Sequence, residues 1–456
     1  MAELVEFYQC RKSLFGVKKY MDISEKVREM LDSYNNNGFL NGSILVASKG
    51  EIIENTGFGF ANREHGIPNS KSTKYLIGSL TKALTAFAIF QLHDKGKLNI
   101  NDMIGKYMGN YPDGENISIY HCLTNTSGIP NYTSFRDFWS NTMRLPSSLN
   151  QLIDTFKDQP LNFKPGKQFE YSNSGYAVLT AIIEKVSSMS YSDYMREEIF
   201  IPFGMKNTGC DDGRKIIPEL ASGYSLWEET IHAEYTDMSF PLGAYGLYST
   251  TEDIYIWDRA LKRSNLLHDG LMSKMFTPNH SSYASGWVVS EILSRKCIHH
   301  FGDISGYCSS FLRFIEDEVT VIFLSNLNIT PVSHLTKEIA KVVFEEEVTL
   351  PSPLKSIPLK NPHEIVGNYQ VENDQSKMVR ISEKRNELYL ITSKMYGVPY
   401  KYRLIPVEER LYKTTFLTEF VNEKVILHYS RTSGKIEYVQ YIDLYGEEYI
   451  CYPIEF

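Results

Sequence analysis

Residues 75–90 read YLIGSLTKALTAFAIF and contain a single charged side chain, Lys82. The run from Ser79 to about His93 is apolar enough to form a buried helix, which ends at "DKGK". Because Lys82 follows Ser79 by three residues, both side chains lie on one face of that helix. Apolar surroundings lower the pKa of a lysine and let it accept the proton of a neighbouring serine. The stretch therefore predicts a serine nucleophile with a lysine base at the start of a buried helix.

A structural role also fits these two residues. Ser79 can be an N-cap, and Lys82 can carry its ammonium group to the surface above an apolar stem. The S-x-x-K spacing is short, and it recurs at Ser352–Lys355. That copy lies in the proline-rich segment "LPSPLKSIP", which cannot form a helix interior. The choice between the two roles depends on the rest of the chain.

Two further short motifs carry groups that suit acyl transfer. The segment "FEYSNSGYAVL" places Tyr171 and Asn173 just before a helical pattern. A phenol can pass a proton to a leaving group, and an amide can hold substrate and lysine together. The segment "CIHHFGDISGY" places His300 and Gly302 on a predicted edge strand, where glycine permits the close approach of a substrate. Each motif alone also fits an ordinary tight turn or a structural histidine.

The elements around these motifs indicate an α+β fold. Amphipathic helices are predicted at 22–34 and 331–347, and β-hairpins at 42–60 and 309–326. We expect the two hairpins to join one antiparallel sheet, covered by the terminal helices. The segment between the hairpins would form a more helical lobe.

Domain boundaries follow a change in composition after residue 349. Residues 1–21 form an N-terminal extension, and 22–349 form the α+β domain. The four prolines of 350–362 indicate a stiff linker. Residues 363–456 hold short runs with period-two alternation, which are typical of a small antiparallel barrel or sandwich.

The composition argues against several classes of protein. The net charge is −8 without a long basic run, so a nucleic-acid partner is not expected. The six cysteines form no C-x-x-C pair, which indicates neither a zinc site nor a disulfide framework. No secretory signal and no membrane-spanning apolar stretch is visible, so we expect a cytoplasmic location.

The three motifs, in this order, resemble the active site of the serine β-lactamase and penicillin-binding-protein superfamily. The closest branch is the class C β-lactamase-like group, which includes D-peptidases, D-aminopeptidases, β-lactamase-fold esterases and small penicillin-binding proteins. Its third motif is often H-x-G. The resemblance covers roughly residues 25–345 and includes "YHCLTNTSGIPNY" and "GAYGLYSTTEDIYIWDRAL". The tail from about residue 360 is similar to the lipocalin-like barrel often fused to this branch.

The resemblance implies catalytic roles for three residues. Ser79 resembles the nucleophile, Lys82 its base, and Tyr171 the proton shuttle. The implied reaction is serine hydrolysis through an acyl-enzyme, without a metal or organic cofactor.

Four residues are implied in substrate binding. Asn173 resembles the amide beside the lysine, and His300 and Gly302 take the positions of the third-motif strand. The N–H groups of Asp303 and Ser79 would form the oxyanion hole.

Three positions depart from the pattern of the family. Asn125 stands where relatives commonly have histidine, Tyr245 interrupts a usual Gly-Gly pair, and Gly78 stands where alanine is frequent. None of these changes removes a catalytic residue.

The first expectation for the substrate is a D-stereospecific peptidase or amidase, or a penicillin-binding-protein-like peptidase. His300 is expected to be mostly neutral and Asp303 negative at pH 7, which disfavours free carboxylates. We therefore expect small-molecule or peptide substrates, including those with D-residues, and β-lactams as weak acylating ligands. A carboxylesterase, an acyl-transferring cyclase and a non-catalytic sensor of peptides or β-lactams stay open as alternatives. The sequence leaves the oligomeric state open.

Overall fold

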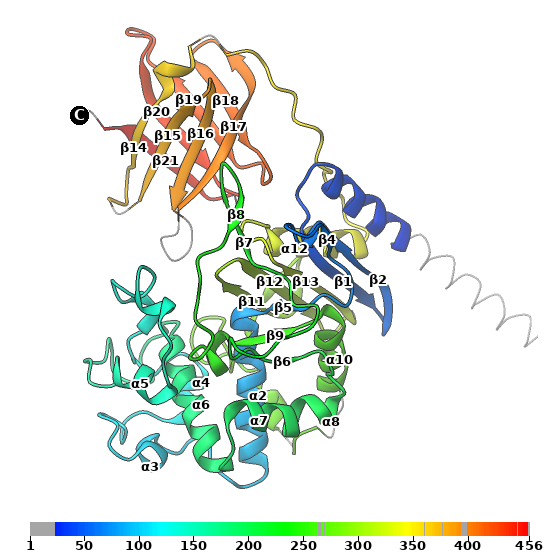
Figure 1. Cartoon of the computed structure of the whole chain (residues 1–456), viewed down its shortest axis with the longest axis vertical. Helices are drawn as coiled ribbons and strands as arrows, with labels where there is room; N and C mark the ends of the chain where they lie inside the picture. The colour runs from blue at the N-terminus through cyan, green and yellow to red at the C-terminus, as the bar shows by residue number, and fades with distance from the viewer. Residues whose placement is uncertain are drawn as a thin grey trace, which may run out of the picture.

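The computed structural model describes residues 23–262, 266–268, 270–359, 361–375, 377–393, 399–444 and 446–454. The predicted N-terminal extension, 1–21, lies outside these residues. Figure 1 shows a lower body of mixed sheet and helix, and an upper barrel reached through an extended linker.

The lower body is built on one antiparallel sheet in the order β10-β11-β12-β13-β1-β2. Its strands are β10 (Val288–Ile292), β11 (Arg295–Ile304), β12 (Tyr307–Phe314), β13 (Val319–Ser325), β1 (Gly42–Ser48) and β2 (Glu51–Phe58). The two predicted hairpins are β1–β2 and β12–β13, and β1 pairs with β13. The prediction that both hairpins join one sheet is therefore confirmed.

The predicted edge position holds for the H-x-G motif but not for the whole strand. β10 pairs with the first half of β11, residues 295–299. Only residues 300–304 extend beyond β10, and this free half carries the H-x-G motif. The segment "VVSEI" of β10 has only five residues, two of them polar, so it shows no clear strand pattern in the sequence.

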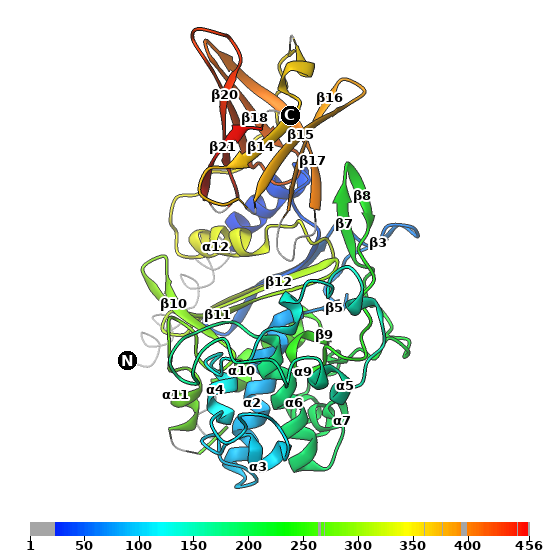
Figure 2. The ribbon, with the colours of Figure 1, turned by 90° about the vertical axis from the view of Figure 1, so that its left-hand side faces the viewer.

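Helices cover both faces of this sheet. The helix over 23–36 and α12 (Val332–Val343) lie on the face toward the barrel, as Figure 2 shows for α12. Ile23, Val27 and Leu31, which carry the predicted amphipathic pattern, are all buried there. The helical lobe lies against the opposite face.

Helix α2 is the buried centre of the helical lobe. Most of its residues are buried on every side, because it is apolar all round. Helix α2 spans Thr81–Asp94. The other helices of the described lobe are α3 (Gly105–Met108), α4 (Ile119–Leu123), α5 (Leu149–Asp154), α6 (Asn173–Ser187), α7 (Tyr191–Met195), α8 (Ile201–Phe203), α9 (Leu242–Tyr245), α10 (Thr251–Leu261) and α11 (Leu271–Met275). Short strands pair nearby as β5 (Tyr75–Leu76), β9 (Leu247–Ser249) and β6 (Gly209–Cys210), and as β3 (Phe60–Asn62) and β4 (Ile67–Pro68).

The upper domain is a closed antiparallel barrel. Its strands are β14 (Gly367–Val371), β15 (Met378–Lys384), β16 (Glu387–Ser393), β17 (Pro399–Arg410), β18 (Lys413–Thr418), β19 (Lys424–Tyr429), β20 (Ile436–Ile442) and β21 (Glu448–Pro453). The barrel closes because β16 pairs with both β15 and β17. The sequence predicted this β domain but missed β18, whose segment "KTTFLT" lacks clear alternation.

A hairpin of the lower body continues the barrel sheet. β7 (Tyr224–Trp227) and β8 (Glu229–His232) form this hairpin, and β7 pairs in parallel with β17 at Lys401. Its turn residue Glu228 forms ion pairs with Lys384 and Lys401 of the barrel. This link could not be predicted from the sequence, because its partners lie more than 150 residues apart.

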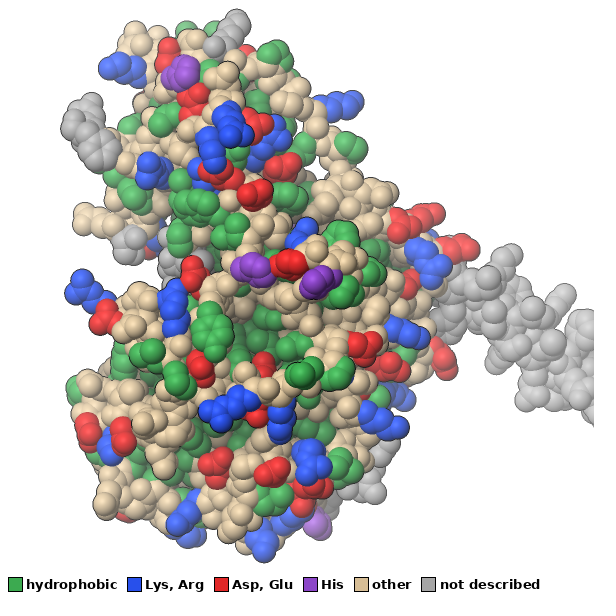
Figure 3. All heavy atoms as spheres, viewed as in Figure 1, with side chains coloured by type: hydrophobic (Ala, Val, Ile, Leu, Met, Phe, Trp, Pro, Cys, Tyr) green, Lys and Arg blue, Asp and Glu red, His purple; other side chains and the backbone are tan. Residues whose placement is uncertain are grey.

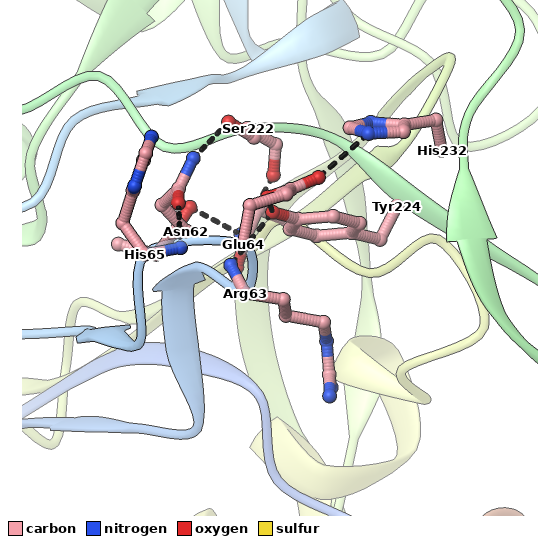
Figure 4. A network of polar contacts seen from close by, with 9 residues as sticks. Asn62, Arg63, Glu64, His65, Ser222, Tyr224 and His232 are labelled. Atoms are coloured by element: carbon pink, nitrogen blue, oxygen red, sulfur yellow. Dashed lines mark hydrogen bonds and ion pairs between the residues drawn. The ribbon is translucent and has the colours of Figure 1, made fainter.

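The base of the same hairpin is fixed by a polar network with the β3–β4 turn (Figure 4). The Tyr224 hydroxyl accepts a hydrogen bond from the Arg63 backbone at 2.8 Å and also contacts the Glu64 carboxylate. Glu64 lies 2.6 Å from the His232 ring on β8. The hairpin is thus held at its base by the lower body and at its tip by the barrel.

A buried ion pair fixes α10 to the main sheet. Arg313 of β12 donates to Asp258 of α10 at 2.6 Å, and neither side chain is more than 1% exposed. We expect Asp258→Ala to lower the free energy of unfolding by about 3–5 kcal/mol, because it leaves a buried guanidinium without its partner. Thermal unfolding measures the loss. The control Glu198→Ala removes the exposed pair with Lys95 and should cost at most about 1 kcal/mol; equal losses would contradict the prediction.

Candidate active site

Ser79 lies in a short 3₁₀ turn, Gly78–Leu80, directly before α2. Gly78 turns the chain into this helix with φ +53°, a conformation that favours glycine. A Cβ atom at Gly78 would also lie 2.6 Å from the backbone nitrogen of Asp303. Glycine at this position therefore lets the serine turn pack directly on β11.

Lys82 has three polar neighbours, and a neutral amine can satisfy all three of them. Its Nζ atom lies 2.7 Å from Asn173 Oδ1 and 2.8 Å from the Ala244 carbonyl oxygen, which can only accept hydrogen bonds. The third neighbour is Ser79 Oγ at 3.1 Å. A neutral amine has two N–H donors and one lone pair. With both donors directed to the two acceptors, the lone pair is left for the serine hydroxyl proton.

Burial pushes the lysine and the nearby tyrosine toward their neutral forms. Lys82 is 0% exposed, and this desolvation lowers its pKa well below the ordinary value. Burial also raises the pKa of the Tyr171 phenol, and a hydrogen bond with Ser79 only partly opposes the effect. The Tyr171 ring centre lies 4.8 Å from Lys82 Nζ. The site thus pairs a neutral amine, which can accept a proton, with a protonated phenol, which can donate one.

The loop that carries Tyr171 and Asn173 is fixed by asparagines and a threonine. Asn125 Oδ1 accepts the N–H of Ser172 at 3.1 Å, and Asn131 Oδ1 accepts the N–H of Asn173 at 3.1 Å. The Asn173 amide also donates to Thr133 Oγ1 at 3.1 Å. Asn125, noted above as a departure from the family, therefore helps to position this loop.

His300 is buried and neutral. Burial, with a smaller contribution from the nearby Lys82, lowers its pKa to about 3. Its Nδ1 lies 2.6 Å from the Phe301 carbonyl oxygen, which can only accept, so Nδ1 carries the proton. Its Nε2 faces the hydroxyl of Tyr283 at 3.2 Å. His300 therefore brings no positive charge to the site at neutral pH.

Gly302 brings the backbone of β11 against the serine turn. A Cβ atom there would lie 2.1 Å from the Ile77 carbonyl oxygen and 3.0 Å from the Ser79 nitrogen. The backbone nitrogens of Ser79 and Asp303 thus belong to two segments in direct contact. This is the placement that an oxyanion hole needs.

The Asp303 side chain lies on the other face of β11. Side chains alternate along a strand, so Asp303 shares a face with Phe301, opposite to His300 and Gly302. Burial raises the pKa of Asp303 to about 8, which leaves it mostly protonated at pH 7. The negative charge that the sequence argument placed beside a substrate carboxylate is therefore largely absent in the free protein.

Several residues of the site were missed by sequence reasoning. The Ala244 carbonyl is a backbone group without a side-chain signal. The cavity beside Ser79 is also lined by Phe138 and Trp139, whose position the sequence could not reveal. Tyr245, noted above as a departure from the family pattern, lines the same cavity. Ser352 of the second S-x-x-K copy is exposed and lies in irregular chain, not in a helix. Within the described ranges, no group of His, Cys, Asp and Glu side chains is arranged to hold a metal, and no helix is long and apolar enough to cross a membrane.

Curated relatives match more than half of this chain. The Bacillus subtilis (strain 168) protein PbpX is 35% identical over 274 residues, covering 60% of this chain and 67% of the relative. A penicillin-binding protein of the same strain is 30% identical over 315 residues, covering 63% of this chain and 68% of the relative.

Solved structures match the fold. An octameric penicillin-binding protein homologue from Pyrococcus abyssi covers 94% of this chain and 99% of its own, with a TM-score of 0.63 and 23% identity. A D-amino acid amidase from Ochrobactrum anthropi SV3 covers 71% and 99%, with a TM-score of 0.62 and 22% identity. The predicted fold, a β-lactamase-like domain followed by a β-barrel, is confirmed. The beta-lactamase family model matches residues 23–343, and with the serine and lysine side by side, the chain belongs to this family of serine hydrolases.

Proposed function

We propose that this protein cleaves amide or ester bonds through an acyl-enzyme on Ser79, with D-amino acid amides or D-peptides as its preferred substrates. One observation carries the mechanism. A fully buried Lys82 lies 3.1 Å from Ser79 Oγ, with its other two neighbours able only to accept hydrogen bonds.

In the proposed first step, Ser79 Oγ attacks the carbonyl carbon and its proton passes to Lys82. The N–H groups of Ser79 and Asp303 stabilise the oxyanion of the tetrahedral intermediate. Tyr171 gives its proton to the leaving amine or alkoxide, and Lys82 returns a proton to Tyr171. Water, or an amine in a transfer reaction, then attacks the acyl-enzyme and regenerates Ser79.

Two observations support D-amides as substrates: the fold shared with a D-amino acid amidase, and the absence of a positive charge on His300. The D-amino acid amidase shares the fold over most of its own length. The neutral His300 supplies no cation for a terminal carboxylate. Amides therefore suit the site better than substrates that end in a free carboxylate.

A labelling experiment combined with a substrate panel tests this function. A fluorophosphonate probe should label Ser79 covalently, as shown by peptide mass mapping, and Ser79→Ala should not be labelled. The panel contains D- and L-amino acid amides, D-peptides, short esters and nitrocefin. Labelling without turnover of any of these compounds would favour the non-catalytic sensor, and faster turnover of L-amides would contradict the stereochemical preference.

We expect β-lactams that carry a carboxylate to acylate Ser79 slowly, because His300 is neutral. His300→Lys places a cation at this position and should speed acylation by about 10–100-fold, the worth of one charge-assisted hydrogen bond of about 1.5–3 kcal/mol. Stopped-flow labelling with a fluorescent penicillin measures the rate. The control His299→Lys alters the neighbour on the opposite face of β11 and should leave the rate unchanged. Rapid nitrocefin turnover by the unmodified protein would contradict this prediction.

A further inference from the structure

Three cavities that share lining residues lie between Ser79 and the barrel. The cavity beside Ser79 shares Trp139 and Asp303 with a second cavity of about 200 Å³. The second shares Asp303, Asn328 and Tyr400 with a third of about 320 Å³ between the two domains. Figure 3 shows this side of the molecule hollowed between the barrel and the helical lobe, with hydrophobic side chains in the hollow. Asp303 borders all three cavities, with its backbone toward Ser79 and its carboxyl group toward the barrel.

The barrel forms one wall of the third cavity. Tyr400, Tyr402, Val421 and Glu423 come from the barrel, and Phe301 and Asp303 are among the residues facing them from the lower body. The hairpin β7–β8 lines the second cavity and is fixed at both ends, as described above. The walls of these cavities therefore come from both domains, and the hairpin β7–β8 links the two domains.

The acidic and basic side chains among the described residues that line these cavities are all carboxyl groups, apart from one histidine. The described lining residues include the carboxyl groups of Asp303, Glu234 and Glu423, but no lysine or arginine. Glu234 is paired with Arg144, and Glu423 accepts a hydrogen bond from the Tyr441 hydroxyl at 2.6 Å. The one histidine of the lining, His232, faces Glu64. Among the described lining residues, a cation would thus meet carboxyl groups, and an anionic group would meet no lysine or arginine.

The third cavity also offers aromatic rings. The Tyr400 and Tyr402 ring centres lie 6.2 Å apart, and Phe301 borders the same space. Aromatic faces attract cations. These rings match a ligand that carries a positive charge.

We propose that the inter-domain cavity binds a cationic group of the substrate, an ammonium or a guanidinium, with Asp303 as its counter-charge. The inference rests on the proposed acyl-enzyme function and adds the class of substrate. Burial penalises the charge of Asp303 and raises its pKa to about 8. A bound cation supplies the missing partner and favours the carboxylate. The inter-domain cavity has a volume of about 320 Å³, at the lower end of the range of about 300–1,000 Å³ typical of ligand pockets.

Matched substrate pairs test the proposal on both sides of the scissile bond. In the acyl arm, the p-nitrophenyl ester of ε-aminocaproate is compared with that of heptanoate, its neutral isostere. In the leaving-group arm, the N-acetyl-D-alanyl amide of cadaverine is compared with that of hexylamine. We expect kcat/KM to favour the cationic member by about tenfold or more in one arm, which identifies the part of the substrate that reaches the cavity.

Variants assign the preference to the cavity. Asp303→Asn keeps the backbone N–H and removes the charge, and should bring the cationic-to-neutral ratio close to one. Tyr400→Leu should lower the ratio by about threefold through the loss of an aromatic face. The control Glu408→Gln removes an exposed carboxylate of the same barrel strand, outside the cavities, and should leave the ratio unchanged.

Two results would overturn the proposal. One is equal kcat/KM for the cationic and neutral members in both arms, and the other is a cationic preference that persists in Asp303→Asn. In either case, labelling of Ser79 and turnover of the neutral members would show that the acyl-enzyme function holds and only the cationic site fails. Absence of both labelling and turnover would instead reject the proposed function itself.

Discussion

Ser79→Ala is expected to lower kcat/KM by about 10⁴–10⁶, because the nucleophile and its base act as a unit. Lys82→Ala should cost a similar amount, and the double variant little more than either single one. The reason is geometric: the Lys82 lone pair has one available hydroxyl, that of Ser79. Steady-state kinetics on the best substrate of the panel measures the loss, and circular dichroism checks that each variant is folded.

Ser352→Ala is the matched control for this result. It removes the serine of the second S-x-x-K copy, which is exposed in the linker. Its activity should equal that of the unmodified protein. An inactive Ser352→Ala together with an active Ser79→Ala would reject the assignment of the site.

Gly302→Ala should lower kcat by at least about 10²–10³, the usual cost of losing one oxyanion-hole donor. The added methyl group would lie 2.1 Å from the Ile77 carbonyl oxygen and 2.4 Å from Ser309 Oγ. Ile77 precedes the serine turn, so relief of this clash must separate β11 from Ser79. We therefore expect a loss of kcat together with slower fluorophosphonate labelling.

Gly367→Ala is the control for the glycine substitution. Gly367 lies in β14 of the barrel, where an added Cβ would lie no closer than 3.4 Å to its neighbours. Its kcat should not change. A Gly302→Ala variant with normal kcat would show that β11 does not supply the oxyanion hole in the way proposed.

The sequence could predict the parts of the site that depend on local spacing. Ser79 and Lys82 are three residues apart on a helical stretch, and Tyr171 and Asn173 open the next long helix, α6. The hairpins of the main sheet were also predictable, because alternation and turn residues are local signals. The family resemblance then implied that these motifs belong to one active site.

The remaining features depend on contacts between distant segments. The Ala244 carbonyl reaches Lys82 from 162 residues away and has no side-chain pattern to reveal it. The direction of the Asp303 side chain follows from the register of β11, and its protonation follows from burial that both domains create. Neither the burial nor the register could be obtained from the spacing of residues alone.

The pairing of β7 with β17 has a consequence for co-translational folding on the ribosome. The main sheet is complete once α12 has been synthesised, but β17 begins more than 50 residues after α12 ends. At about 5–20 residues per second, the outer edge of β7 waits for several seconds without its partner strand. Unpaired strand edges promote aggregation, so this interval is when a nascent chain is most exposed to misassembly. Slow synthesis through the linker would lengthen this interval, and binding of a chaperone to the hairpin would protect it.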